Sequence, residues 1–273
     1  MKFADLHLHT LFSDGTYTAK ELVEKALKSG LAAISLTDHD TVSGIEPAIA
    51  EGLLSNLEVL PGIELTAEEE GCEIHILGYL IEIKQKKLLE KLAALKNNRV
   101  ERIYKITDKL KGLGLNLEAQ DVFALAKGGC PGRLHIARAM VEKGLVSNIY
   151  EAFKKYIGDK CPGYVAGFKL TPQAAIELIK ASGGVPVLAH PQTLNNDGLI
   201  PKLVNCGLMG LEVYYPEYSQ GAVNFYLGLA ERFNLLVTGG SDCHGLAKPE
   251  IKIGLIKIPY ELVDKLKEAK NRL

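Results

Sequence analysis

Hydrophobic and polar positions along the chain follow two alternating spacings. Apolar runs of roughly four to eight residues are typical of buried strands, and apolar residues three and four positions apart are typical of helices. Strands are expected at 3–9, 33–37, 57–60, 63–66, 73–81, 185–189, 210–214, 235–238 and 254–258. Helices are expected at 18–29, 43–55, 171–182, 199–205, 221–233 and 260–272. This alternation predicts an α/β fold, either a TIM-like parallel barrel with distortions or an open doubly wound sheet.

Local signals mark the ends of two of these helices. Thr18 is a good N-cap, and Glu21 stands three residues further on, which is the spacing of a capping box. Gly30 follows the same helix and is expected to end it. Thr171 is a second N-cap, with Pro172 at the first helical position. These signals support the helical half of the alternation independently of the apolar spacing.

The pattern changes between residues 85 and 165, where strand signals vanish and later return. The segment is rich in Lys, Leu, Glu and Ala at helical spacing, and Gly112 and Gly114 interrupt it. We therefore expect a helical insertion at 85–165 that caps the site of a barrel formed by 1–84 and 166–273.

Composition limits the classes of partner. The chain has 273 residues, of which 47% are hydrophobic, and its net charge is −1. That content supports a sizeable core, and the charge balance does not predict a surface for duplex DNA. No apolar run approaches the roughly 20 residues that span a bilayer, so no membrane partner is expected. With no obvious association seam, the expected oligomeric state is a monomer.

The cysteines point to a reducing compartment. Their number is odd and no two have CxxC spacing, which argues against a disulfide framework and a thiolate zinc site. No basic-then-apolar signal segment precedes the first strand. Cytoplasmic localisation is therefore expected. The five cysteines are at positions 72, 130, 161, 206 and 243.

The first strand carries the most informative polar residues. His7 and His9 are two positions apart, so both side chains lie on one side of an extended strand and can offer nitrogen ligands to one ion. Asp14 follows after a short turn and can add an oxygen ligand. A doubly wound sheet usually has a Gly-rich turn here instead. Taken alone, the two histidines could also be ordinary strand residues.

Similar residues stand at the ends of other strands, and in a parallel barrel those ends converge on one face. A four-coordinate ion needs about four ligands and a two-ion site about six to eight, so nine candidates suggest three divalent ions. Taken singly, His75 could be a core histidine and Asp40 is better explained as a turn residue. The nine candidate metal ligands are His7, His9, Asp14, His39, Glu64, His75, His190, Asp242 and His244.

The charge of such a site indicates its substrate. Three divalent ions with Asp14, Glu64 and Asp242 leave a net charge of about +3, because neutral histidines add none. A site of this charge attracts phosphate and stabilises the charge that develops on its oxygens. Water shared between the ions is expected to lose its proton near neutral pH and act as the nucleophile. No Ser or Cys nucleophile is then required.

The ordered set of motifs resembles the PHP (polymerase and histidinol phosphatase) family. The match covers the barrel on both sides of the insertion. The resemblance implies a distorted (βα)7 barrel and a metal-dependent phosphoesterase with a trinuclear site, usually of manganese, zinc or iron. The motifs are His7-x-His9 with Asp14, Thr37-Asp38-His39-Asp40, Gly62-Ile63-Glu64, His75, Ala189-His190-Pro191 and Ser241-Asp242-x-His244.

The resemblance also assigns the ligands. Because all nine positions hold the expected residue type, it argues against a degenerate, non-catalytic copy. The general acid is left open between His190, His244 and a metal-bound water. The implied ion sites are His7, His9, Glu64 and Asp242 for the first, Glu64, His75 and His190 for the second, and Asp14, His39 and His244 for the third, and the residues with implied catalytic roles are Asp14, His39, Glu64, His190 and His244.

Within the family, the insertion and the stretch 132–138 are similar to nucleoside 3′,5′-bisphosphate phosphatases and to 5′-to-3′ exoribonucleases that trim short RNA. This similarity implies that Arg133 and His135 sit above the ions and bind a second phosphate. Their alternative role is a helix N-terminus with a solvated arginine. Arg99 and Arg102 are weaker candidates, because most helix arginines are simply solvated.

The expected function is hydrolysis of phosphate esters of nucleotides or short oligoribonucleotides by a metal-activated hydroxide. One alternative within the same reaction class is a histidinol-phosphate phosphatase. An alternative of a different class is a metal-binding accessory protein without turnover. The expected partners are thus a small phosphorylated substrate, a nucleotide or short RNA, and three divalent ions.

Overall fold

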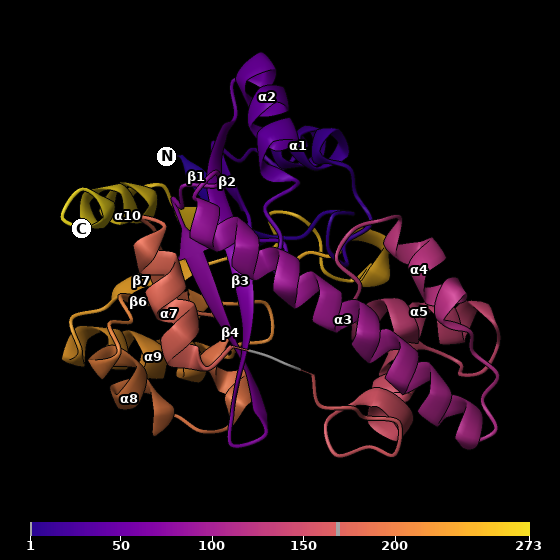
Figure 1. Cartoon of the computed structure of the whole chain (residues 1–273). Coiled ribbons are helices and arrows are strands. Elements are labelled where there is room, and N and C mark those ends of the chain that lie inside the picture. Colours follow the sequence, from indigo (N-terminus) through magenta and orange to yellow (C-terminus); the bar gives the residue numbers. More distant parts are fainter. Residues whose placement is uncertain (1, 168–169) are drawn as a thin grey trace.

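A single sheet forms the centre of the molecule in the computed structural model, which describes residues 2–167 and 170–273 (Figure 1). Its strand order is β7-β6-β5-β4-β3-β2-β1-β8. The sheet nearly closes into a barrel, because the backbone N–H of Asp242, after β7, donates to the carbonyl of His7 on β1. The expected distorted barrel is thus confirmed. The strands are β1 (Phe3–Leu8), β2 (Ala33–Leu36), β3 (Glu58–Glu69), β4 (Cys72–Tyr79), β5 (Val185–Leu188), β6 (Gly210–Tyr214), β7 (Leu236–Gly239) and β8 (Ile258–Pro259).

The distortion lies in β4 and β8. β1–β2, β2–β3, β5–β6 and β6–β7 pair in parallel, as expected, whereas β4 is antiparallel to both β3 and β5. The chain turns back directly after β3 through Glu70 and Gly71, with φ values of 52° and 78°. Two successive residues in the left-handed region form a tight hairpin and leave no room for a crossover helix.

The last predicted strand is largely wrong. Only Ile258 and Pro259 form β8, and they pair antiparallel with Phe3 and Ala4. A turn at 253–254 and a bend at 255–256 take the place of most of the expected strand. The backbone N–H of Gly254, with φ 75°, donates to the carboxylate of Asp5, so this segment is held by a side chain rather than by a strand ladder.

Helices cover the barrel (Figure 1). Thr18 caps α1 as predicted: its hydroxyl accepts from the N–H of Glu21, and the Glu21 carboxylate accepts from the N–H of Thr18. The hydroxyl of Thr171 accepts from Ala174 at the start of α7 in the same way. The helices of the barrel are α1 (Ala19–Lys28), α2 (Ile45–Ser55), α7 (Pro172–Ala181), α8 (Leu199–Asn205), α9 (Gln220–Arg232) and α10 (Glu261–Lys270), with the 3₁₀ turns η2 (Pro191–Leu194) and η3 (Gly245–Ala247).

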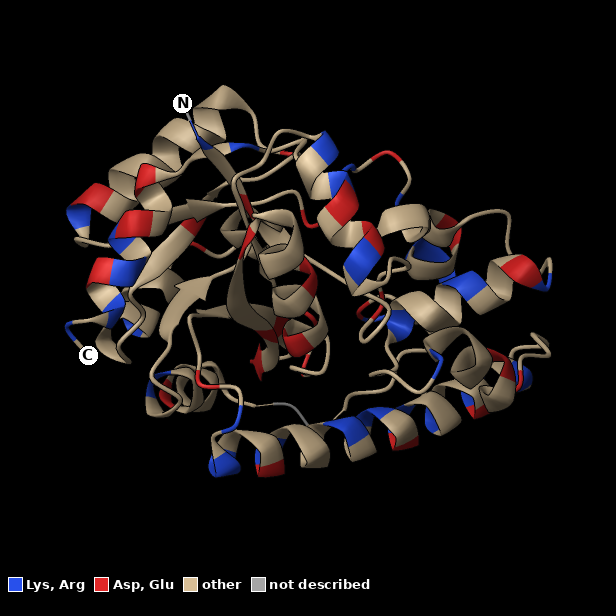
Figure 2. Cartoon of the chain, turned by 90° about the horizontal axis from the view of Figure 1, so that it is seen from above, with Lys and Arg blue, Asp and Glu red and all other residues tan. Residues whose placement is uncertain are grey.

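The segment between β4 and α7 is helical and packs its own core. The first half of α3 buries Leu88, Leu92 and Leu95 in a barrel cluster, whereas its second half buries Ile103 and Ile106 in a separate cluster shared with the helices that follow. Figure 1 shows α3 running from the barrel to these helices, and Figure 2 shows basic and acidic residues interspersed along it. The boundary at 85–165 stays an interpretation. The helices are α3 (Lys86–Gly112), α4 (Ala119–Ala126), α5 (Arg133–Glu142), α6 (Ile149–Ala152) and the π-helix η1 (Phe153–Ile157).

Among the residues that the structure describes, no helix combines the length and the apolar character needed to cross a bilayer.

Candidate metal centre

The candidate ligands come from six strands but meet around one carboxylate, that of Glu64. His7 lies on β1, and the loops after β1, β2, β5 and β7 carry most of the others. His75 arrives on the antiparallel strand β4, where it pairs with Thr66. Thr66 lies two residues after Glu64 and hence on the same side of β3, so the hairpin places His75 beside Glu64. All nine candidate ligands are thereby brought together.

A first group consists of His7, His9, Glu64 and Asp242. The Nε2 atoms of the two histidines are 3.1 Å apart. Both lie 3.2 Å from Oε2 of Glu64, and they lie 3.3 and 3.0 Å from Oδ1 of Asp242. Each residue thus offers a ligand atom to one small volume, and all four side chains are buried.

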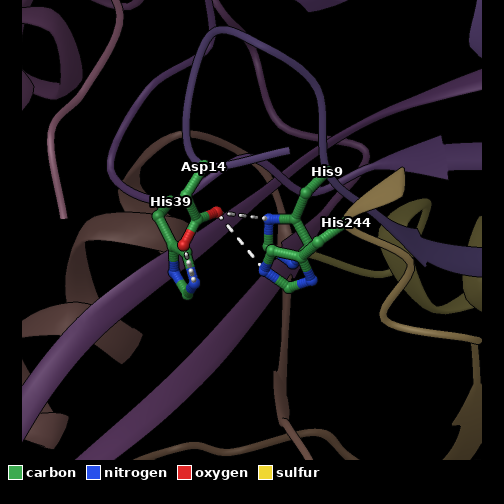
Figure 3. A group of neighbouring side chains, drawn as sticks. All are labelled: His9, Asp14, His39 and His244. Atoms are coloured by element: carbon green, nitrogen blue, oxygen red, sulfur yellow. Dashed lines mark ion pairs between the residues drawn. The ribbon is translucent and has the colours of Figure 1, made fainter. Parts of the chain in front are cut away.

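A second group surrounds Asp14, which points between His39 on one side and His9 and His244 on the other (Figure 3). Its Oδ1 is 3.3 Å from Nε2 of His244 and 3.8 Å from Nδ1 of His9. Its Oδ2 is 3.9 Å from Nε2 of His39. These separations exceed a hydrogen bond but suit atoms that share a central cation.

A third group lies on the other oxygen of Glu64. Oε1 is 2.8 Å from Nδ1 of His75 and 3.2 Å from Nε2 of His190. His39 also approaches this group, because its Nδ1 is 3.2 Å from Oε2 of Glu64. Oε2 of Glu64 therefore faces His7, His9 and His39, and Oε1 faces His75 and His190. This is the position of a bridging carboxylate.

Neighbouring groups fix which nitrogen of two rings carries the proton. The Nδ1–H of His7 donates to the Glu212 carboxylate at 2.8 Å, and the Nδ1–H of His244 donates to the backbone carbonyl of Asp242 at 2.8 Å. The Nε2 lone pairs of both rings are then directed at the groups described above. Such partners orient ligand rings and raise their basicity.

Glu212 was not among the predicted site residues. It is fully buried, and its second oxygen accepts the backbone N–H of His190 at 2.8 Å, so it holds two candidate ligands at once. One signal was present in the sequence: Glu212 is the only charged residue in the apolar run 210–214. A carboxylate inside a buried strand needs partners that repay its desolvation.

The electrostatics of the centre favour positive charge. Burial lowers the pKa of His9, but the carboxylates of Asp242 and Glu64 outweigh this effect and raise the pKa to about 9. Burial also lowers the pKa of His75, but the Glu64 carboxylate outweighs it and raises the pKa to about 10. Burial raises the pKa of Glu64, yet the surrounding histidines hold it well below its ordinary value. The carboxylates thus stay ionised and draw cations to the cluster.

Several buried atoms of the cluster fit a cation better than a hydrogen-bond network. Oδ1 of Asp14 and Nδ1 of His39 lack a hydrogen-bond partner among the described residues. Nε2 of His7 lies 3.1 to 3.3 Å from Nε2 of His9 and from one carboxylate oxygen each of Glu64 and Asp242, so four potential ligand atoms crowd one volume. Unsatisfied buried acceptors are costly, and a divalent ion between them removes that cost.

The backbone of the centre is held in uncommon conformations. His190 has φ 28° and Asp242 has φ 53°, both in the positive range that non-glycine residues seldom adopt. Asp40 has φ 51° and accepts the N–H of Thr66 while pairing with Arg99, so it serves the turn, as the sequence suggested. Strain of this kind is typical of functional sites.

A cavity of about 380 Å³ adjoins the cluster, and among the described residues four cationic side chains line it together with candidate ligands. Arg133 pairs with Glu73 at 2.9 Å and with Asp159 at 2.6 Å. Arg102 donates from Nε to the carbonyl of Val165 at 2.7 Å, while its buried Nη2 lacks a hydrogen-bond partner among the described residues. The cationic side chains are those of Arg99, Arg102, Arg133 and Lys248.

The two predicted substrate-binding residues therefore lie differently. Arg133 lines the cavity, whereas the ring of His135 is buried behind it with 1% of the residue exposed. Nδ1 of His135 accepts the N–H of Gly132 at 3.1 Å, which caps the start of α5. The position of His135 thus suits holding Arg133 in place better than contacting a substrate. Arg99, considered a weaker candidate, forms a buried ion pair with Asp40 at 2.5 Å and also lines the cavity.

The comparison with protein families matches residues 5–158 to the PHP domain, which is more than half of the chain. The chain belongs to the PHP family. This confirms the resemblance seen in the motifs, and with it a metal-dependent phosphoesterase. Relatives that match most of this chain are named for different activities.

The 5′-3′ exoribonuclease Rnm of Escherichia coli is 34% identical over 88% of this chain and 84% of its own length. The phosphoribosyl 1,2-cyclic phosphate 1,2-diphosphodiesterase of Eggerthella lenta is 31% identical over 88% and 94%. The 3′,5′-nucleoside bisphosphate phosphatase of Chromobacterium violaceum is 29% identical over 88% and 86%. All three are enzymes that act on phosphate esters.

The fold is shared with a solved structure. A protein of Bifidobacterium adolescentis, described as a predicted metal-dependent phosphoesterase, superposes with a TM-score of 0.90 at 32% identity, over 96% of this chain and 94% of that one. The helical segment that follows β4 is thus part of a common architecture, since so high a coverage leaves little of either chain outside the match.

Proposed function

We propose that this PHP protein hydrolyses phosphate from 3′,5′-bisphosphonucleotides or from short oligoribonucleotides, with three divalent ions bound in the cluster. The observation that carries the proposal is the pairing of two features in one place. A buried cluster of acceptors around Glu64 suits divalent ions, and the adjoining cavity carries arginines suited to a second phosphate. The substrates named for two relatives, RNA and nucleoside bisphosphates, have that second phosphate.

The proposed ligand sets follow from the lone pairs. A neutral imidazole has one lone pair, so each histidine serves one ion. His9 then belongs with His7, Glu64 and Asp242, where its Nε2 is closest to the carboxylates. Asp14 with His39 and His244 forms a second set, and Glu64 with His75 and His190 a third. Glu64 bridges two sets through its two oxygens. Manganese, zinc and iron all accept such nitrogen and oxygen donors.

The ions, when bound, supply Lewis-acid polarisation of the phosphate and lower the pKa of water. The chain supplies the orientation. Glu212 holds His7 and His190, and the carbonyl of Asp242 holds His244, so the ring nitrogens stay aimed at the ions. Lys248 lines the cavity with its Nζ 3.2 Å from Oδ2 of Asp242, where it can donate to a phosphate oxygen.

The second phosphate is placed by the insertion. Arg102 lines the cavity and has a buried Nη2 without a hydrogen-bond partner among the described residues, and Arg133 keeps its guanidinium beside the cavity through Glu73 and Asp159. A phosphate between these guanidiniums gains charge-assisted hydrogen bonds. In this proposal Arg133 contacts the phosphate and His135 positions Arg133 by capping α5.

The five cysteines are free, which supports the cytoplasm as the compartment we propose. We propose a monomer as the active form, because the sequence has a balanced charge and no obvious association seam.

The test is phosphate release from 3′-phosphoadenosine 5′-phosphate and from histidinol phosphate, side by side, with manganese and with EDTA. Manganese-dependent release from the nucleotide alone supports the proposal, and release from histidinol phosphate alone replaces it with that activity. Asp14→Ala, His39→Ala and Glu64→Ala should each abolish release while the far-ultraviolet circular dichroism is kept. Metal bound without release from any phosphate ester would favour an accessory protein.

A further inference from the structure

A second cavity, of about 370 Å³, lies on the outer side of the loop that follows His244. It is bordered by Tyr17, by two lysines of α1 and by the segment 245–253. We call it the lysine groove. The residues used below are Tyr17, Lys25, Lys28, Leu246 and Lys252.

The groove adjoins the metal centre along two chain segments. Asp14 lines the first cavity and Tyr17 the groove, and likewise His244 lines the first cavity and Leu246 the groove. Thr16 ties the segments together, since its hydroxyl oxygen accepts the N–H of Leu246 at 2.7 Å. A segment of two or three residues spans at most roughly 10 Å, so the backbones of Asp14 and Tyr17, and those of His244 and Leu246, lie within about that distance of each other.

The lysine groove is suited to bind a negatively charged ligand. Lys25, Lys28 and Lys252 are exposed, and no carboxylate is among the described residues that line it. Lys25 lies over the ring of Tyr17 at 4.6 Å, and Leu246 is 73% exposed at the rim. Cationic groups that follow a backbone, combined with aromatic and apolar side chains for bases, are how proteins bind single strands.

Resting on the proposed function, we infer that the lysine groove binds the backbone of a single-stranded oligoribonucleotide beyond the scissile phosphate. Glu73 pairs with both His75 and Arg133, so the arginine suited to a terminal phosphate lies on the His75 side of the metal centre. The lysine groove lies on the other side, beyond His244 and Asp14. A strand therefore has cations on both sides of the metal centre. A mononucleotide is held by the first cavity alone and does not reach the groove.

The inference is tested with a variant that replaces the three groove lysines by glutamine, Lys25→Gln, Lys28→Gln and Lys252→Gln together. The substrates are a 5′-phosphorylated pentaribonucleotide and 3′-phosphoadenosine 5′-phosphate. We expect KM for the pentanucleotide to rise on the order of tenfold, while kcat/KM for the mononucleotide changes less than twofold. The matched control is Lys265→Gln, an exposed lysine on α10, which should change neither.

Salt dependence gives a second readout. A single strand loses affinity with a slope of about −0.7 in log K against log salt for each phosphate neutralised, so the variant should lose about two units of slope for the pentanucleotide. The inference would be overturned if the variant lost the same factor in kcat/KM on both substrates. It would also be overturned if the salt slope for the pentanucleotide were unchanged.

Binding separates this inference from the proposed function. Fluorescence anisotropy of a labelled pentaribonucleotide is measured with EDTA present, so no turnover is needed. Weaker binding by the variant than by wild type supports the groove even if neither substrate is hydrolysed. Hydrolysis of both substrates, with equal oligonucleotide affinity in the variant and wild type, keeps the proposed function and rejects the groove.

Discussion

At the scale of single residues, Glu212 is not a candidate ligand but orients two of the candidate ligands. Its oxygens hold Nδ1 of His7 and the backbone N–H of His190. Glu212→Gln keeps the shape but replaces a carboxylate by a neutral amide, so His7 becomes a poorer donor to the ion. We expect manganese affinity to fall about 10- to 100-fold, measured by calorimetry. Glu217→Gln, an exposed change nearby, is the control. Unchanged affinity would show that His7 is oriented without Glu212.

His135 gives a prediction on pH. Burial lowers its pKa from 6.5 to about 4, so the folded state resists protonation that the unfolded state accepts. The unfolded state then binds more protons between these values, and stability falls as the pH drops from 6.5 towards 4. A shift of this size corresponds to about 3 kcal/mol. His135→Gln keeps an acceptor for Gly132 and removes the titration.

Urea unfolding with EDTA present, at pH 7 and pH 4.5, measures the effect. The variant should lose less free energy of unfolding than wild type over this interval. An equal loss in both proteins would mean that His135 is already solvated in the native state.

The candidate ligands were predictable from the sequence because polar residues at strand ends stand out against apolar runs. The role of His135 as a substrate contact stays a prediction, because a histidine near an arginine suggests an anion site, whereas its ring is buried and accepts the N–H of Gly132. Lys248 was not singled out and Arg102 was only a weaker candidate, because their sequence contexts resemble those of solvated lysines and arginines. Their value depends on the cavity, which is a property of several elements together.

At the scale of elements, the alternation of apolar runs located most strands and helices, and caps at Thr18 and Thr171 fixed two helix starts. Strand direction was not predictable in the same way. A run such as 73–81 looks identical in either direction, and only the left-handed pair Glu70 and Gly71 makes β4 antiparallel. The short β8 was missed because its place beside β1 depends on contacts distant in sequence.

The ion pair between Arg99 and Asp40 joins α3 to the loop after β2. Both side chains are largely buried, at 17% and 2% exposure. Arg99→Met leaves the Asp40 carboxylate buried without its partner, so we expect the free energy of unfolding to fall by about 3 kcal/mol or more. Chemical denaturation measures it. Lys86→Met, in an exposed pair with Glu90 on the same helix, should change it by less than about 0.5 kcal/mol.

The double variant Arg99→Met with Asp40→Asn extends this test, because it removes both charges. Partial recovery of stability relative to Arg99→Met is expected. No recovery would assign the loss to packing of the arginine stem instead of the charge left behind.

At the scale of the whole molecule, two hydrophobic cores share one helix, α3, and the metal centre lies beside the cavity that residues of both parts line. The buried carboxylates of Glu64, Asp14 and Asp242 repel one another unless positive charge lies between them. Ions that bind only the folded state stabilise it, by about 2.7 kcal/mol at a hundredfold excess over Kd. For a chain of this size that corresponds to a rise in Tm of several degrees.

Thermal unfolding with manganese and with EDTA measures this shift, and Glu64→Gln identifies its origin. Glu64 belongs to two of the three proposed ligand sets, and its Oε2 lies 3.2 Å from Nδ1 of His39 in the other, so its neutral analogue should lose most of the manganese-dependent rise in Tm. Glu261→Gln, an exposed carboxylate at the start of α10, should keep the full rise. A rise in Tm that survives Glu64→Gln would place the stabilising ion outside the cluster. Loss of the manganese-dependent rise in Glu64→Gln, with the full rise kept in Glu261→Gln, makes Glu64 the residue through which metal binding and folding are coupled.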